Sequence, residues 1–237
     1  MRYNGRMDVA ERSRSPLSNA YADGFVPPAL VEECANSVTH GLGFALSVVG
    51  GIILMQRVFE RGTLAVAVAC GVYVAALLGV YGASTLSHVF QAPELKCRLR
   101  KWDQGLIYLL IVGTYTPLAV AYFGGFGLGL FLLMVWAVAA VGFLSKVVWK
   151  HRVGQISTWS YVFLGWAPAL AVKPALELMP SAAVWWVVAG GVCYTVGVLF
   201  MLLDGKVRFF HAVWHLWVIA GSTCHFLAIL WYVAWLP

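Results

Sequence analysis

Two histidines near the C-terminus, His211 and His215, have a spacing that suits metal binding. Four residues along a helix turn the chain by about 400°, so the two rings differ in direction by about 40° and share one face. A third histidine, His88, closes another apolar stretch and could add an imidazole from a second helix. Three histidine ligands that leave a fourth position for water are typical of catalytic zinc. The pattern therefore predicts a Zn²⁺ site held by His88, His211 and His215.

The composition explains why these histidines are informative. Of the 237 residues, 61% are hydrophobic and only 11% are charged, and the mean hydropathy is +0.81. Such a chain is too apolar to be a water-soluble globule, so it is expected to be a multi-pass membrane protein.

Seven stretches are long enough to cross about 30 Å of hydrocarbon as helices. They lie near residues 34–57, 63–90, 102–123, 126–149, 156–173, 181–203 and 209–236. The alternating pattern of an outer-membrane barrel is absent. The predicted fold is an all-α membrane protein, with a seven-transmembrane helix bundle in residues 31–237. Residues 1–30 are polar and have no apolar core of a signal peptide, so they are expected to form a mobile cytoplasmic tail.

The distribution of basic residues predicts the orientation of this bundle. Of the 16 Lys and Arg residues, 13 fall in the N-terminal tail or in loops on the same side, and only Arg57, Arg61 and Lys173 fall on the other. The N-terminus is therefore predicted to be cytoplasmic and the C-terminus outside, in the plasma (inner) membrane. The net charge of +6 follows from this rule and from anionic lipid headgroups that the basic loops would contact. No nucleic-acid partner is needed to explain it.

The same topology gathers further polar residues at the cytoplasmic level of the histidines. Asp103 is expected at the start of the third span, and Ser84 lies one turn before His88. A carboxylate there could orient a metal-bound water and take its proton, so Asp103 and Ser84 are candidate catalytic residues. The alternatives are a capping or interfacial role for Asp103, and a hydrogen bond from Ser84 to its own i−4 carbonyl.

The first span adds three polar residues at this level: Glu33, Asn36 and His40. Glu33 and His40 share a helical face, and Asn36 lies within about 60° of them. They could hydrogen-bond the metal ligands, or simply cap and anchor the helix. His225 lies roughly 15 Å beyond His215 along the helix, so we expect it to make a satisfied polar contact within the bundle. Pro117 is expected to kink the third span and to open space for a lipid chain.

Five segments together resemble the hemolysin III family, the bacterial branch of the progestin and adipoQ receptor (PAQR) group that includes the adiponectin receptors. They are EECANSVTHGLG at 32–43, STLSH at 84–88, WDQGLIYLLIVGTYTP at 102–117, YVFLGW at 161–166 and HAVWHLWVIAGSTCHF at 211–226. The resemblance implies seven helices and a zinc near the cytoplasmic face, held by His88, His211 and His215, with Ser84 and Asp103 close to the metal-bound water. Gln104 departs from the histidine that bacterial members commonly have after the aspartate.

The wider group that this family resembles includes membrane ceramidases. The resemblance therefore implies a zinc-dependent hydrolase of a lipid amide or ester, with a membrane lipid as substrate or ligand. One alternative is a receptor or signalling protein in which the zinc is structural, and the fourth metal ligand would discriminate the two. A pore-forming cytolysin is less favoured, because seven apolar spans without a signal peptide do not suit a secreted toxin. The oligomeric state is left open by the sequence.

Overall fold

The computed structural model describes residues 28–123, 126–148 and 155–236. All regular structure in these residues is helical. The helices are α2 (Pro28–Arg61), α3 (Leu64–Val89), α4 (Pro93–Tyr122), α5 (Phe126–Val147), α6 (Gln155–Gly165), the short 3₁₀ helix η1 (Ala167–Ala171), α7 (Val172–Leu178), α8 (Ser181–Leu202) and α9 (Phe210–Tyr232). Most of the predicted N-terminal tail lies outside the described residues.

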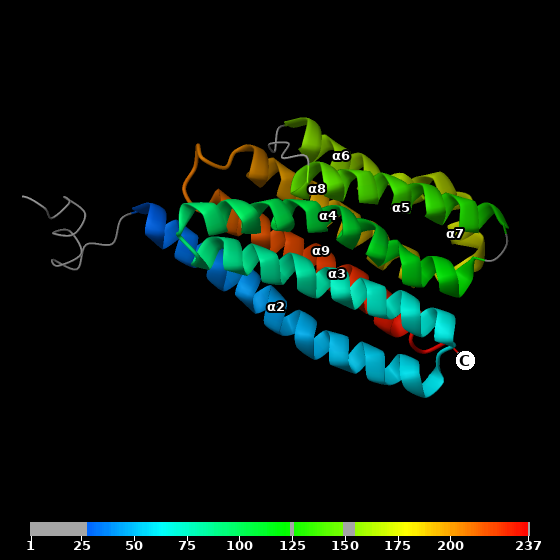
Figure 1. Ribbon diagram of the computed structural model, residues 1–237. Helices are drawn as coiled ribbons and strands as arrows, with labels where there is room; N and C mark the ends of the chain where they lie inside the picture. Colours follow the sequence, from blue (N-terminus) through cyan, green and yellow to red (C-terminus); the bar gives the residue numbers. More distant parts are fainter. Residues whose placement is uncertain (1–27, 124–125, 149–154, 237) are drawn as a thin grey trace, which may run out of the picture.

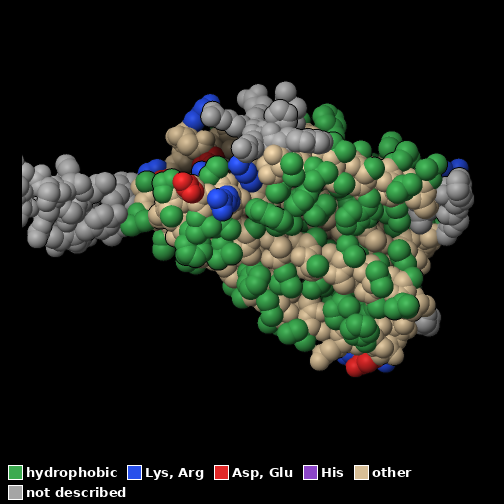
Figure 2. All heavy atoms as spheres, in the orientation of Figure 1, with side chains coloured by type: hydrophobic (Ala, Val, Ile, Leu, Met, Phe, Trp, Pro, Cys, Tyr) green, Lys and Arg blue, Asp and Glu red, His purple; other side chains and the backbone are tan. Residues whose placement is uncertain are grey.

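Six of the described helices are long and apolar enough to cross a membrane: α2, α3, α4, α5, α8 and α9. Hydrophobic side chains cover the middle of the face drawn in Figure 2, and charged side chains gather at its two ends. At the end opposite the histidines, Arg57 and Arg61 lie over the Trp235 ring, 4.4 and 5.2 Å from its centre. This distribution is that of a multi-pass protein embedded in a membrane, with an apolar belt between polar ends.

The stretch predicted as one helix at residues 156–173 is interrupted. Helix α6 ends at Gly165, and the chain continues through η1 into α7. Pro168 lies at the start of η1 and lacks the amide proton that a continuing α-helix would need. Together α6, η1 and α7 carry the chain from one end of the bundle to the other (Figure 1). The predicted count of seven spans therefore depends on this interrupted segment.

Helix α4 begins earlier than the sequence predicted. A loop was expected before residue 102, but the helix starts at Pro93, where a proline costs no hydrogen bond because the first amides of a helix have no partner within it. The basic residues expected in that loop, including Lys96 and Arg100, lie on the first turns of α4 instead. Asp103 is consequently about three turns inside the helix and cannot cap it, so the capping alternative for Asp103 is wrong.

Five of the described helices form the part of the bundle that positions the histidines. Helix α3 packs against α2 and α4, and α9 packs against α2 and α8 (Figure 1). Their shared core contains the buried side chains of Leu54, Tyr73, Leu77, Leu110 and Ile229. A second cluster joins α4, α5 and α6. Inside a membrane such contacts stabilise by close packing rather than by removal from water, and here they fix the register of α2, α3 and α9.

Candidate metal centre

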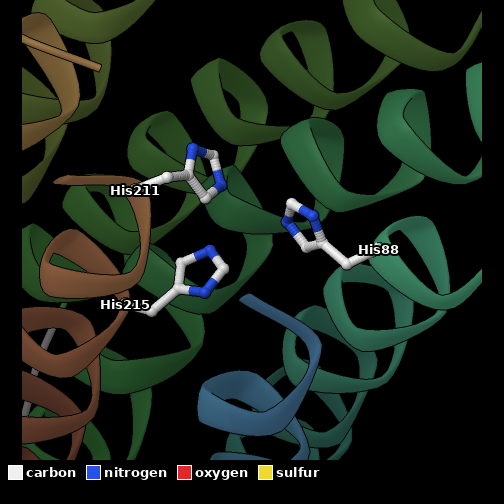
Figure 3. A group of neighbouring side chains, drawn as sticks. All are labelled: His88, His211 and His215. Carbon is white, nitrogen blue, oxygen red and sulfur yellow. The ribbon is translucent and has the colours of Figure 1, made fainter. Parts of the chain in front are cut away.

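The fold brings His88, at the C-terminal end of α3, against His211 and His215 in the first turns of α9. One ring nitrogen from each of the three histidines lies within 4.8 Å of the others. Their ring centres are separated by 4.5 to 5.3 Å, and Figure 3 shows the rings converging on a common space. The three residues predicted as metal ligands therefore form one cluster.

Each of these rings has its Nδ1 atom at an oxygen acceptor. His88 Nδ1 lies 2.6 Å from Glu33 Oε2, and His211 Nδ1 lies 2.7 Å from Asp204 Oδ2. His215 Nδ1 lies 3.2 Å from the Asn36 carbonyl oxygen and 3.0 Å from Thr39 Oγ1. The Thr39 hydroxyl is 2.9 Å from the carbonyl oxygens of Ala35 and Asn36 and can donate to either, so its oxygen can accept from the His215 ring. If every Nδ1 carries the proton, every Nε2 presents a lone pair.

This is the arrangement by which proteins orient neutral imidazoles towards a metal, with an oxygen acceptor behind each ring. A second observation also indicates that these residues suit a metal ion: His215 Nε2 is buried and has no hydrogen-bond partner among the described residues. A buried nitrogen without a partner is costly, and a metal ion would satisfy it. His88, His211 and His215 would hold such an ion through one ring nitrogen each.

Positive charges hold the carboxylate behind His88 in place. Lys96 Nζ donates to Glu33 Oε1 at 2.7 Å, and Arg100 lies 3.4 Å from the same oxygen. Glu33 thus contacts a predicted ligand, whereas Asn36 does so through its backbone carbonyl and leaves its side-chain oxygen without a partner. The sequence indicated the residues of this helix but not the way in which each of them acts.

Asp204 is a member of the site that the sequence analysis missed. It lies in the turn between α8 and α9, and the hydrogen bond from His211 holds the pKa of the Asp204 carboxyl below its ordinary value. The chain reaches α9 through Phe209, whose φ of 64° is unusual for a residue other than glycine. The sequence feature that could have indicated Asp204 is its carboxylate in the loop directly before the helix of His211.

Asp103 and Ser84 lie beside the histidine cluster. Asp103 is close enough to interact with both Ser84 and His211. The Ser84 hydroxyl is buried, and among the described residues the polar side chain that it interacts with is Asp103, with no hydrogen bond to a carbonyl of its own helix. The predicted alternative for Ser84, a bond to its own helix carbonyl, is therefore not what the structure contains. Of these two residues, Asp103 lines the cavity described below.

His40 is the least expected member of the cluster. Its ring is stacked on His215, with 3.4 Å between ring centres, and both of its nitrogens are buried without a hydrogen-bond partner in the part of the chain that the structure describes. His40 therefore lies next to a predicted ligand, as expected, but it contacts that ligand by ring stacking rather than by a hydrogen bond. The two ring nitrogens of His40 therefore remain able to hydrogen-bond a bound ligand.

A cavity of about 320 Å³ begins at this cluster and runs into the bundle. Asp103, His40 and Trp214 line its end at the histidines, and the residues on both sides of Pro117 line its wall. Most of the remaining lining is aliphatic. The cavity is therefore suited to an apolar chain whose polar end lies at the histidines.

Comparison with known proteins agrees with the sequence resemblance. A family model described as "Haemolysin-III related" matches residues 29–226. Hemolysin-3 of Bacillus cereus is 38% identical over 203 residues, which cover 85% of this chain and 92% of that protein. The hemolysin-3 homolog of Bacillus subtilis (strain 168) is 33% identical over 207 residues, covering 87% and 96%. The human monocyte to macrophage differentiation factor is 25% identical over 225 residues, covering 91% and 88%.

Proposed function

This chain belongs to the hemolysin III family, and we propose that it is a zinc-dependent hydrolase of a lipid amide or ester, with its site near the cytoplasmic face of the plasma (inner) membrane. The observation that carries the proposal is the convergence of three histidines, each with its Nδ1 at an oxygen acceptor, beside His40 and Asp103, which line one end of a largely apolar cavity.

The donor set favours zinc or another first-row transition metal over magnesium and calcium, and the open fourth position favours zinc. Three neutral imidazoles that leave one position open are common in catalytic zinc sites, whereas magnesium and calcium prefer oxygen ligands. His88, His211 and His215 would hold the ion. When bound, zinc polarises a carbonyl group and lowers the pKa of a coordinated water.

The remaining chemistry is assigned to this chain's own residues. Glu33 and Asp204 keep the rings of His88 and His211 oriented. Asp103, which interacts with His211 and Ser84, is placed to accept a proton at its carboxylate from the attacking water and to return it to the leaving group. The Ser84 hydroxyl, which lies beside the Asp103 carboxylate, would donate a hydrogen bond to the substrate carbonyl oxygen. The aliphatic cavity would hold the acyl chain and exclude bulk water.

The proposed topology has seven spans, with the interrupted segment α6, η1 and α7 as the fifth. Two features support it. Helix α2 begins at one end of the bundle and the C-terminus lies at the other, which requires an odd number of crossings (Figure 1). The basic residues Lys96, Arg100 and Arg208 lie at the histidine end, as expected for a cytoplasmic face in contact with anionic headgroups.

A receptor or signalling role with a structural metal is the second candidate. A metal bound by α3 and α9 would tie together two helices that are far apart in sequence, and metal binding would then contribute directly to folding. In that case Asp103 would serve as the fourth ligand, and its replacement would lower metal content.

The test combines metal analysis with turnover in detergent-purified protein. Wild type is expected to bind about one zinc per chain and to release fatty acid from a lipid amide or ester. His211→Ala should lose both, whereas Asp103→Asn should keep the metal and lose turnover. Glu60→Gln, at the far end of α2 where Glu60 pairs with Arg57, is the matched control and should change neither. Full turnover in metal-free His211→Ala would refute the hydrolase, and loss of metal in Asp103→Asn would favour the structural role.

A further inference from the structure

A second group of polar side chains lies deep in the bundle, near the middle of the membrane-spanning helices. Ser222 on α9 lies 2.9 Å from the hydroxyl of Tyr81 on α3, which donates to it, and 2.8 Å from the hydroxyl of Tyr194 on α8. His225 follows on the same helix, roughly 15 Å along the axis from His215. Polar residues at this depth are costly unless they have a partner or a function.

Only one of the two ring nitrogens of His225 has a hydrogen-bond partner among the described residues. Its Nε2 lies 3.0 Å from the carbonyl oxygen of Val187, so Nε2 carries the proton and donates to this oxygen. Its Nδ1 is then a hydrogen-bond acceptor, and Nδ1 is buried with no partner among the described residues. The residue as a whole is 6% exposed. The polar contact expected for His225 is therefore present at Nε2, and among the described residues Nδ1 has none.

The neighbouring helices have room for these rings because of two glycines. A Cβ atom at Gly190 on α8 would clash with the His225 ring, and one at Gly221 on α9 would lie 3.0 Å from the Tyr194 ring. Both rings thus sit where a side chain on the facing helix would displace them. The site is built into the packing of α8 against α9.

Tyr194 can provide a donor beside this acceptor. Ser222 already accepts the Tyr81 proton, so the Ser222 hydroxyl can donate to the Tyr194 oxygen. The Tyr194 proton is then free for another acceptor. Tyr194 and His225 together can offer one donor and one acceptor, which is the complement of a single hydroxyl group.

Both residues line the cavity that begins at the histidine cluster. Between the two levels the wall is largely aliphatic and includes Ile107, Leu110, Val198 and Val218. The polar lining residues Thr114, Tyr115 and Thr195 already hydrogen-bond to backbone carbonyls. Groups that still lack a partner therefore occur at two levels of an otherwise apolar cavity, at His40 and at His225.

We propose that Tyr194 and His225 form a subsite for a hydroxyl group on the acyl chain of a bound lipid, whose head lies at the histidine cluster. The position of the head rests on the proposed function, whereas recognition of the hydroxyl does not. A plain acyl chain would leave the His225 Nδ1 unpaired in an apolar environment. A site with a buried polar group discriminates strongly against a ligand that lacks the matching group.

Two fatty acids that differ by one mid-chain hydroxyl test the subsite: ricinoleic acid and oleic acid. Each competes with a fluorescent fatty acid for the full-length, detergent-purified protein. Wild type should bind ricinoleic acid about five- to tenfold more tightly, the effect of one or two buried hydrogen bonds. Tyr194→Phe and His225→Leu should each reduce this preference to about twofold or less, with little change for oleic acid.

Tyr108→Phe is the matched control, because Tyr108 is buried but bonds to Ser160 and does not line the cavity. It should keep the preference of the wild type. Tyr194→Phe leaves the Tyr81 to Ser222 bond intact, so it carries the test even if His225→Leu fails to fold. Equal affinity for the two acids in wild type, or an undiminished preference in Tyr194→Phe, would overturn the proposal. An intact preference without any turnover would contradict the hydrolase and leave the subsite supported.

Discussion

Replacing Glu33 by Gln tests whether the oxygen acceptors behind the histidines tune the metal site. Glu33 Oε2 lies 2.6 Å from His88 Nδ1, and the Glu33 side chain is 19% exposed. The substitution keeps the shape but removes the charge that strengthens this hydrogen bond and makes the imidazole a better ligand. Loss of such an acceptor typically lowers metal affinity about 10- to 100-fold, and the low exposure of Glu33 favours the upper half of that range.

The structure provides two comparisons for this variant. Asp204 makes the equivalent contact to His211 at 2.7 Å but is 41% exposed, so Asp204→Asn should weaken binding by a smaller factor, about three- to tenfold. Glu32 is the sequence neighbour of Glu33 and pairs with Arg208 at 3.0 Å instead. Glu32→Gln should therefore change metal affinity by less than about twofold.

Zinc affinity is measured by competition with a chelator of known affinity, at fixed pH and salt, on purified protein whose metal content is checked by elemental analysis. The expected order of affinity is wild type and Glu32→Gln, then Asp204→Asn, then Glu33→Gln. Equal affinities for Glu33→Gln and Glu32→Gln would refute the reasoning, because the two carboxylates would then be equivalent despite only one of them contacting a histidine.

Three further outcomes follow from the described contacts. Asp103→Asn should lower lipid turnover by at least about 100-fold with metal content unchanged, since it removes the proposed proton acceptor; turnover near that of wild type would contradict this role. Gly190→Ala should lower the thermal unfolding midpoint, because the added methyl group clashes with the His225 ring, and Gly191→Ala is its control, with its nearest neighbour an ordinary 3.5 Å away. Tyr73→Phe removes a buried hydroxyl that has no hydrogen-bond partner among residues 28–123, 126–148 and 155–236, so the midpoint should stay the same or rise, and a clear fall would reveal an unrecognised hydrogen bond.

Much of the candidate site could be read from residue types and spacing. The four-residue separation of His211 and His215 places both rings on one face of any helix, and the apolar composition makes each histidine in a span noteworthy. Glu33 and His40 were found for the same reason, because helical periodicity aligns them before any contact is known. The residues that escaped were Thr39 and Asp204, whose roles depend on contacts across the chain.

Helix boundaries were harder to predict from the sequence, because they depend on local chain-breaking residues and on contacts with neighbouring helices. The basic stretch before residue 102 resembled a loop, yet Pro93 begins a helix there, and Lys96 reaches Glu33 on α2. The predicted fifth span contains Pro168, which interrupts the helix, but its length and hydropathy alone suggested continuity.

The sequence by itself determined that this is a helical membrane protein with imidazoles at the ends of two spans, because hydropathy and helical periodicity are properties of the chain alone. Only the tertiary structure decided which groups those imidazoles contact. The packing of α2 against α3 and α9 places Glu33 and the Asn36 carbonyl behind His88 and His215, and it stacks His40 on His215. The packing of α8 against α9 leaves one nitrogen of His225 without a partner. Hydrogen bonds between segments that are distant in sequence depend on register and crossing geometry, which residue spacing within one helix does not contain.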